Sequence, residues 1–425
     1  MQPRKWAAAL TVLAIAATTS LAATAADIEM TFRFNDPEAE EMRAALDAFE
    51  QENPGVKVEL QTIAWGESRQ QFLREAAVGE GPDVVHIAFV WPRDMGAAGA
   101  LLPLNDLLET QSIQAGFEDF IATELSVGPD GNIYGVPWTT DTWAMVYRTD
   151  VLEAAGVSEI PRTWEALRDA SRAIHEKTGK VGFGFPGGSG SSNTIWFLAN
   201  YYWWSNGSAL VVADGDGFKT GITVEQIAEA MAYYDSFMKE GHNPESMLGV
   251  TSWFDPAILE GMTNGEQGIA IMPPQQFKQI LAAFMERNPG VEPPFVTATT
   301  PGGPEGPKTH LGGRMLGINA NTEHPDAAWK LVEFMTRGDV LTKYYENQFP
   351  AQKSLLRSIE FGPALGGFAE QLTLARSWGA YSDGPAQIGK MWNAAGRAFG
   401  SAFIGERSYE EAAAELLKSV ADQLE

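Results

Sequence analysis

Short apolar runs and amphipathic segments alternate along most of the chain, with the spacing of strands and helices. DIEMTFRF (27–34) alternates apolar and polar residues as a strand does. The residues after it place apolar side chains from Met42 to Phe49 on one face of a helix, which ends at Asn53-Pro54-Gly55. The pattern then predicts a strand at 56–63, a helix at 70–77 and a buried strand within GPDVVHIAFV. This order predicts a parallel sheet with helices on its faces.

The same order of elements recurs later in the chain. The pattern predicts strands at 145–148, 181–185 and 268–272, one helix capped by Thr163 and another over 223–239. A proline- and glycine-rich stretch at 293–313 interrupts the pattern, and the residues after Ala327 are mainly helical. Because about 400 residues exceed the usual size of one domain, the sequence predicts two α/β units.

The first residues have the pattern of an export signal. Arg4 and Lys5 precede an apolar run at 7–17, and small residues lead to Ala23-Thr24-Ala25. We therefore expect a signal peptide at 1–25 and an exported, soluble protein. The apolar run is shorter than the roughly 18 residues that a membrane span needs. No cysteine follows it to carry a lipid anchor.

Composition argues against several classes of partner and chemistry. The net charge is −25, or −27 without Arg4 and Lys5, so the chain repels nucleic acid and anionic membranes. It has no cysteine, which excludes disulfides, thiolate metal sites and cysteine catalysis. The five histidines are scattered, and we expect most of them at the surface or at helix caps. We expect no metal and no cofactor.

The chain has 13 tryptophans. An indole offers a flat apolar face and one N–H donor, which suit a sugar ring as well as ordinary packing. YGVPWTTDTWAMVYRTD (134–150) places two tryptophans and an aspartate between two apolar runs. A carboxylate beside such rings can accept hydrogen bonds from sugar hydroxyls. The stretch is therefore a candidate binding segment.

Several segments, taken in order, carry a resemblance to a known family. They are FEQENPGVKVEL, GPDVVHIA with GALLPLNDLL, GNIYGVPW with MVYRTDVLEAAGV and PRTWEAL, GEQGIAIM, LGGRMLGI, HPDAAWKLVEFM and QFPAQKS. Together they resemble the extracellular solute-binding proteins of bacterial ABC importers, in the carbohydrate branch that is similar to maltose-binding protein (family 1). The segments span nearly the whole chain after the signal.

The resemblance implies a two-lobed α/β periplasmic binding protein of the type II kind. Each lobe would hold a central sheet flanked by helices, built from discontinuous chain with hinge crossings. On this basis we expect lobe 1 to contain 26–140 and 297–350, and lobe 2 to contain 141–296 and 351–425. TTDTW would then cross the hinge between the two lobes.

The resemblance also implies a function. The protein would bind a sugar or oligosaccharide by lobe closure in the periplasm of a Gram-negative cell. It would deliver this ligand to the transmembrane permease subunits of an ABC importer, as a monomer and without catalysing a reaction.

In open α/β sheets, ligands bind at the carboxyl ends of the strands, and this rule selects candidate residues together with the resemblance. Asp36 could equally cap the helix that follows it, and each tryptophan could pack in a core. The expected ligand-binding residues are Asn35, Asp36, Trp65, Phe89, Trp91, Trp138, Thr140, Asp141, Trp143, Ser189, Gln275, Gly313, Arg314, Arg376 and Trp378.

Other ligands and one other class of protein stay open. Arg93, Arg314 and Arg376 could pair with a uronate, a sulfonate or a phosphate such as glycerol phosphate. Acidity would suit a polyamine, and the adjacent tyrosines Tyr201-Tyr202 or Tyr344-Tyr345 would suit iron. A secreted glycosidase would need two carboxylates about 5 to 10 Å apart, but neither H-E-x-x-H nor G-x-S-x-G occurs.

Overall fold

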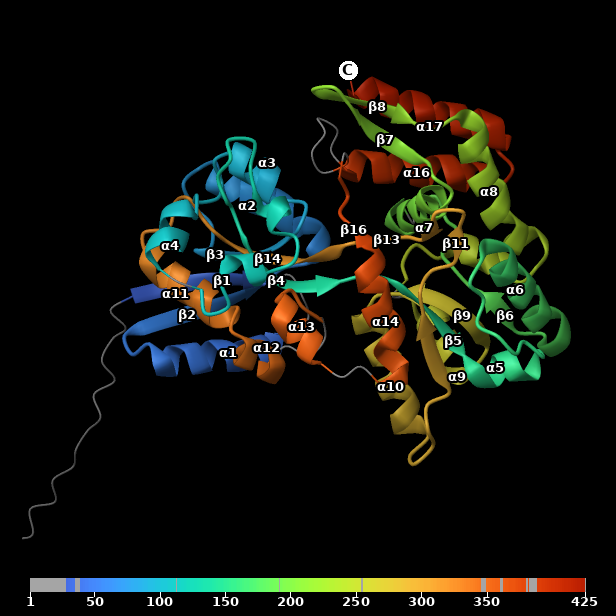
Figure 1. Cartoon of the computed structure of the whole chain (residues 1–425), viewed down its shortest axis with the longest axis horizontal. Helices are drawn as coiled ribbons and strands as arrows, with labels where there is room; N and C mark the ends of the chain where they lie inside the picture. The colour runs from blue at the N-terminus through green and yellow to red at the C-terminus, as the bar shows by residue number, and fades with distance from the viewer. Residues whose placement is uncertain are drawn as a thin grey trace, which may run out of the picture.

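Two lobes lie side by side in the computed structural model of the chain (Figure 1). The structure describes residues 28–34, 39–111, 113–190, 192–253, 255–344, 349–359, 362–379, 381 and 388–424. The predicted signal peptide lies outside these residues. The two-lobed α/β architecture is the one that the sequence predicts.

Lobe 1 is built on a six-stranded mixed sheet. In sheet order its strands are β15 (Phe349–Pro350), β4 (Val136–Asp141), β14 (Gly312–Ile318), β3 (Val84–Ala88), β1 (Ile28–Phe34) and β2 (Val56–Thr62). β1 pairs in parallel with β2 and β3, as the strand-helix-strand pattern predicts. β14 runs antiparallel to β3 and to β4, so the sheet is parallel only in its N-terminal part.

Helices cover this sheet and bury their apolar faces against it. They are α1 (Ala39–Glu52), α2 (Trp65–Ala76), α3 (Pro92–Ala97), α4 (Asn105–Thr110), α11 (Pro325–Met335), α12 (Gly338–Tyr344) and α13 (Lys353–Ser358), with the short 3₁₀ turns η1 (Phe117–Asp119) and η2 (Thr123–Ser126). On α1 the side chains of Met42, Leu46 and Phe49 are buried, which matches the predicted helical face.

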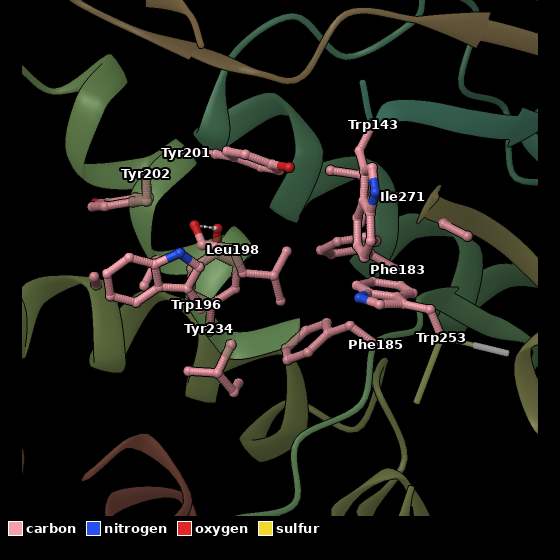
Figure 2. Close-up of a cluster of buried hydrophobic side chains, with 14 of the residues drawn as sticks. Trp143, Phe183, Phe185, Trp196, Leu198, Tyr201, Tyr202, Tyr234, Trp253 and Ile271 are labelled. Carbon is pink, nitrogen blue, oxygen red and sulfur yellow. Dashed lines mark hydrogen bonds between the residues drawn. The ribbon is translucent and has the colours of Figure 1, made fainter. Parts of the chain in front are cut away.

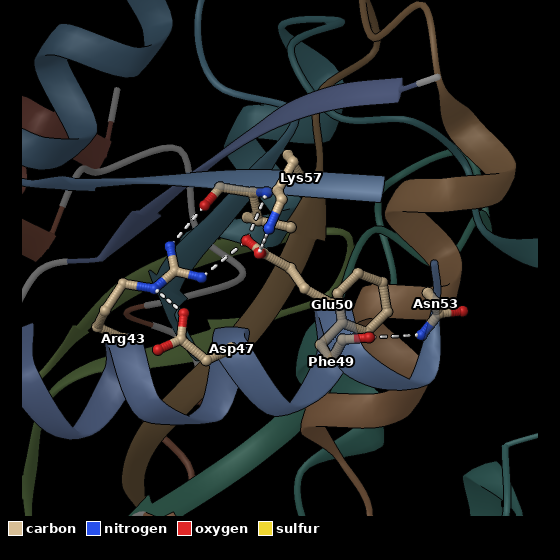
Figure 3. Close-up of polar contacts among 7 residues, drawn as sticks. Arg43, Asp47, Phe49, Glu50, Asn53 and Lys57 are labelled. Carbon is tan, nitrogen blue, oxygen red and sulfur yellow. Dashed lines mark hydrogen bonds and ion pairs between the residues drawn. The ribbon is translucent and has the colours of Figure 1, made fainter. Parts of the chain in front are cut away.

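A set of charged side chains fastens α1 to β2 (Figure 3). Arg43 donates to Asp47 on its own helix and to the Val58 carbonyl of β2, and Lys57 pairs with Glu50. Asp47 and Lys57 are exposed, whereas Glu50 is mostly buried, and a surface ion pair contributes about 0–1 kcal/mol. They therefore fix the register of helix and strand more than they stabilise the lobe.

Lobe 2 has a smaller sheet and more helix. Its four strands in order are β10 (Phe295–Ala298), β5 (Ala144–Arg148), β9 (Gln267–Met272) and β6 (Val181–Phe183). Two-stranded ribbons join β7 (Ala209–Asp214) to β8 (Gly217–Gly221), β11 (Gly302–Gly303) to β12 (Gly306–Pro307), and β13 (Thr309–His310) to β16 (Ala375–Arg376). Its helices are α5 (Thr149–Ala154), α6 (Trp164–Thr178), α7 (Ser192–Ser205), α8 (Val224–Lys239), η3 (Glu245–Gly249), α9 (Pro256–Asn264), α10 (Pro274–Arg287), α14 (Pro363–Leu374), α16 (Ile388–Phe403) and α17 (Tyr409–Leu424).

The core of lobe 2 is rich in aromatic rings, many of them from α7. Trp196, Tyr201 and Trp203 are fully buried, and Figure 2 shows Trp196 and Tyr201 among rings from other elements, including Trp253 and Phe185. A helix that is apolar around most of its circumference is buried on most sides. None of the helices within the described ranges is long and apolar enough to cross a membrane.

Within the described residues the chain passes between the lobes three times: between β4 and β5, between β13 and β14, and between α13 and α14. β4 and β14 are neighbours in the lobe 1 sheet, so the first two crossings lie side by side (Figure 1). After the third, α14 packs on β10, where Thr297 Oγ1 donates to the Ala364 carbonyl at 2.9 Å.

The second and third crossings differ from the predicted segment bounds. The sequence predicts 297–350 as a lobe 1 segment, but its first residues bond to lobe 2, where the Gly302 N–H donates to the Arg162 carbonyl at 2.9 Å. Conversely, α13 docks on lobe 1, where Ser354 Oγ donates to Asp119 at 2.5 Å. The proline- and glycine-rich stretch carries little hydrophobic pattern, so the pattern alone does not assign it to a lobe.

Candidate functional site

Five of the expected site residues meet where β4 ends beside β14. Thr140 and Asp141 are the last residues of β4, and Gly313 and Arg314 lie opposite this strand in β14. The Thr140 hydroxyl donates to a β14 carbonyl at 3.0 Å. From the end of β3, the Phe89 N–H donates to the Gly313 carbonyl at 3.2 Å. The structure thus joins three separate parts of the sequence at the first two crossings.

Gly313 lets β14 approach Phe89 and β4 closely. Its φ of +149° is favoured by glycine, and a Cβ there would lie 2.4 Å from the Phe89 ring and 2.4 Å from the Thr139 carbonyl oxygen. Phe89 itself is buried. Both residues therefore shape the backbone of the site.

Asp141 and Arg314 form the charged pair of the junction. Arg314 Nη1 lies 3.5 Å from Asp141 Oδ2, and only 7% of Asp141 is exposed. Burial raises the pKa of the Asp141 carboxyl, and the charge of Arg314 opposes this rise. The pair offers hydrogen-bond acceptors and donors together, which suits a ligand that carries several hydroxyls.

Four aromatic rings in contact, which we call the aromatic wall, stand on the lobe 2 side of the junction. The wall consists of Trp143, Phe197, His310 and Trp378. Trp143 and Phe197 have ring centroids 4.4 Å apart, Phe197 and His310 4.6 Å, and His310 and Trp378 5.2 Å. The expected residues Trp143 and Trp378, distant in sequence, therefore belong to one ring cluster.

Arg376 lies on β16 beside this wall. Its guanidinium carbon is 4.8 Å from the centre of the Trp204 ring, and the residue is exposed. A cation over an indole face is stabilised by the ring electrons. The guanidinium is thus held in place at the surface.

The structure corrects the expectation that Trp138 lies in the binding site. Its ring is fully buried in the lobe 1 core, edge-on to Phe34 and to His86. Its indole N–H donates to the Met335 carbonyl at 2.8 Å. β4 is an inner strand of the sheet with all of its residues buried, so this indole packs inside the lobe and does not form a wall for a ligand.

The other expected residues lie on both lobes. Trp91 is half-buried and packs on the lobe 1 core just before α3, Gln275 is half-buried in the first turn of α10, and Ser189 is exposed before α7. Ser189 lies against Gly400, where a Cβ would come 2.6 Å from the Ser189 Cα. Asn35 and Asp36 lie outside the described residues, as does the side chain of Trp65 at the start of α2.

Sequence reasoning missed Phe197 and His310 as members of this site. It also expected most histidines at the surface, whereas His86, His242 and His310 are buried. A lone histidine in KTHLGG gives little signal, and Phe197 stands in a helix whose neighbours are mostly apolar. Only the pairing of β13 with β16 brings His310 next to Trp378.

One serine, histidine and glutamate arrangement in lobe 2 has the connectivity of a catalytic triad. Ser171 Oγ is 2.7 Å from His242 Nδ1, and His242 Nε2 is 3.1 Å from Glu240. Ser171 is fully buried and also accepts the Phe183 N–H at 2.8 Å. Because no substrate can reach a hydroxyl that is covered and already bonded to the backbone, we assign this group to packing between α6 and β6.

Tyr201 and Tyr202, considered for iron, have separate partners. The Tyr201 hydroxyl lies 2.6 Å from His310 Nδ1, and the Tyr202 hydroxyl donates to Glu229 at 3.1 Å. Across the described residues, no group of three or more histidine and acidic side chains could hold a metal ion. Tyr345 of the second pair is outside the described residues.

Solved structures with the same fold cover almost the whole chain. The GacH receptor of Streptomyces glaucescens, solved unliganded and with acarbose, aligns with a TM-score of 0.79 at 21% identity, over 94% of this chain and 98% of that one. An ABC transporter solute-binding protein of Thermotoga lettingae bound to α-D-tagatose aligns with a TM-score of 0.78 at 21% identity, over 93% and 100%. These likenesses confirm the two-lobed fold.

Sequence relatives agree with this assignment. A binding protein of Brucella abortus is 27% identical over 355 residues, which are 81% of this chain and 80% of the relative. The diacetylchitobiose-binding protein of Streptomyces coelicolor is 24% identical over 276 residues, 64% of this chain and 60% of the relative. Residues 35–339 match the family of bacterial extracellular solute-binding proteins. The chain belongs to this family.

Proposed function

We propose that the protein is the periplasmic sugar-binding component of an ABC importer in a Gram-negative cell. It is exported by the signal peptide at 1–25, works as a monomer, and delivers a sugar or oligosaccharide to the permease without changing it. The observation that carries this proposal is the junction, where the Asp141–Arg314 pair of lobe 1 lies beside the aromatic wall of lobe 2.

The chemistry of the junction suits a sugar. Rings cover the C–H face of a pyranose while a carboxylate and a guanidinium bond to its hydroxyls. Relatives named for diacetylchitobiose and for arabinooligosaccharides, and neighbours solved with acarbose, tagatose and maltose, support a carbohydrate ligand. Since Arg314 already faces Asp141, the junction favours a neutral glycan over a uronate, a sulfonate or a phosphate.

A thermal-shift screen of the mature protein tests the proposal. The panel contains maltose, maltotriose, N,N′-diacetylchitobiose and arabinobiose as neutral sugars, with digalacturonate, glycerol 3-phosphate, spermidine and Fe³⁺ as the alternatives. We expect at least one neutral sugar to raise the unfolding temperature, because a ligand that binds only the folded state stabilises it. Small-angle scattering should show a smaller radius with that sugar, since closure needs contacts with both lobes.

Two outcomes would overturn the proposal. A rise with spermidine, glycerol phosphate or iron alone would replace the ligand class. Turnover of an oligosaccharide, followed by chromatography of the products, would make the protein an enzyme.

A further inference from the structure

His310 occupies an unusual place at the second crossing. It ends β13, which pairs in parallel with β16 of lobe 2, and Gly312 two residues later begins β14 of lobe 1. The residue is 97% buried, since only 3% of its surface is exposed. A buried imidazole needs partners for both ring nitrogens.

Two aromatic rings of lobe 2 stack against this imidazole and also contact each other, with centroids 5.7 Å apart. Phe197 of α7 lies at 4.6 Å and 19° to it, and Trp378, which follows β16, lies at 5.2 Å and 26°. Tyr201 is also parallel to it within 4°. All three rings come from lobe 2, so the imidazole packs as part of the lobe 2 ring cluster.

The edge of the imidazole joins lobe 2 to the charged pair of lobe 1. Nδ1 is 2.6 Å from the Tyr201 hydroxyl, and Nε2 is 3.8 Å from Asp141 Oδ1, while Arg314 approaches the other oxygen of that carboxylate. Burial and the charge of Arg314 lower the pKa of His310 to about 3, so the ring is neutral at neutral pH. The contact with Asp141 is longer than a hydrogen bond, whereas the Tyr201 hydroxyl is within hydrogen-bond distance of Nδ1.

We propose that His310 is a positioning residue of the binding site: it connects the other rings of the aromatic wall to the Asp141–Arg314 pair and so fixes how far apart the two lobes hold their ligand contacts. The titratable and charged groups around it are Tyr201 on α7, Asp141 on β4 and Arg314 on β14. Arg376, its register partner on β16, directs its guanidinium over Trp204. The inference rests on the proposed function only in stating that these contacts meet a sugar.

The distance between the lobes can be measured without any ligand. The native chain has no cysteine, so Val78→Cys in lobe 1 and Ile404→Cys in lobe 2, at side chains 74% and 62% exposed, accept spin labels at defined positions. Double electron–electron resonance then gives the distribution of label distances in the full mature chain. It is compared between the labelled parent and the additional variants His310→Phe, Tyr201→Phe and His86→Phe.

His310→Phe keeps a stacked ring and removes both nitrogens, so we expect a shifted or broader distance distribution. Tyr201→Phe removes only the hydroxyl on Nδ1, and we expect a smaller shift in the same sense. His86→Phe is the matched control: His86 is a buried histidine stacked on Phe34 at 4.7 Å in lobe 1. Its replacement should lower stability and leave the distances unchanged.

Distributions for His310→Phe and Tyr201→Phe that coincide with the parent would overturn the proposal, as would an equal shift in His86→Phe. If His310→Phe does not fold, Tyr201→Phe decides. Titration of each variant with maltotriose and with N,N′-diacetylchitobiose measures how the same substitutions change sugar affinity. If the parent binds no sugar of the wider panel, the proposed function fails, while the distances still decide the role of His310.

Discussion

At the scale of single residues, the Asp141 carboxyl is a buried acidic group at the proposed binding junction. We expect Asp141→Asn to weaken sugar binding about 10- to 100-fold, since a hydrogen bond to a charged group contributes about 1.5–3 kcal/mol. Fluorescence titration with the sugar that gives the largest thermal shift measures this. Asp150→Asn removes the same charge from the Arg148 pair on α5 and should leave the affinity unchanged. Parent-like affinity in Asp141→Asn would remove this carboxylate from the site.

Trp138 leads to the opposite prediction. Trp138→Phe loses the bond to the Met335 carbonyl and part of a buried ring, so we expect a loss of about 1–3 kcal/mol in the free energy of unfolding. Because this side chain faces the lobe 1 core, sugar affinity should stay that of the parent wherever the variant is folded. Urea unfolding and titration at the same temperature separate the two effects. A weakened sugar affinity in the fully folded variant would show that Trp138 contributes to the binding site.

These two residues show how far residue type alone can predict a site. Both stand within one short stretch and both suit a sugar, so the sequence identifies the stretch that reaches the crossing. It does not show which of the two packs in the lobe 1 core, because that depends on β14 and α11, which pack around β4 from far along the chain. Asp141 ends the strand at the junction, whereas Trp138 lies deeper in it and becomes core.

At the scale of elements, Gly313 controls how closely β14 approaches the end of β3. Gly313→Ala would place a methyl group 2.4 Å from the Phe89 ring and the Thr139 carbonyl, so we expect an unfolding free energy lower by about 1–3 kcal/mol and a weaker sugar affinity. Gly215→Ala is the control for backbone strain alone, because Gly215 has φ +60° with nothing within 4 Å of its Cβ position. Equal losses in the two variants would show that the approach to Phe89 does not matter.

Local sequence signals predicted helices and strands well, but they did not predict which distant strands pair. The Thr163 cap forms as expected, and the predicted helix that begins near Thr223 has a reciprocal capping box of Thr223 and Gln226. The two-residue strands β13 and β16 were not predicted, since so few residues carry no periodicity. The seven residues of β14, GGRMLGI, do not alternate apolar and polar side chains, and this strand was not predicted either. His310 was missed because only the pairing of β13 with β16 brings it to the junction, while Phe197 reaches it from α7.

At the scale of the whole molecule, three buried histidines make stability depend on pH. Burial lowers the pKa of His86, His242 and His310, the last to about 3, while the unfolded chain titrates near 6.5. Between pH 6.5 and the folded pKa the unfolded state binds more protons. This part of the stability is therefore full above about pH 6.5 and is lost as the pH falls, by up to about 1.4 kcal/mol per pH unit for each histidine.

Urea unfolding of the mature protein from pH 7 to pH 5 measures this loss. That range lies above the ordinary pKa of glutamate, and Glu50 and Glu75, whose pKa the fold lowers further, lose stability in the same direction but at lower pH. Asp141 acts in the opposite sense, because burial raises its pKa. His310→Phe should reduce the slope by up to about 1.4 kcal/mol per pH unit, whereas Tyr201→Phe keeps the imidazole and should keep the slope. A slope that is the same in His310→Phe as in the parent would mean that His310 takes up its proton in the folded state. The assignment of a neutral His310 imidazole beside Asp141 would then be wrong.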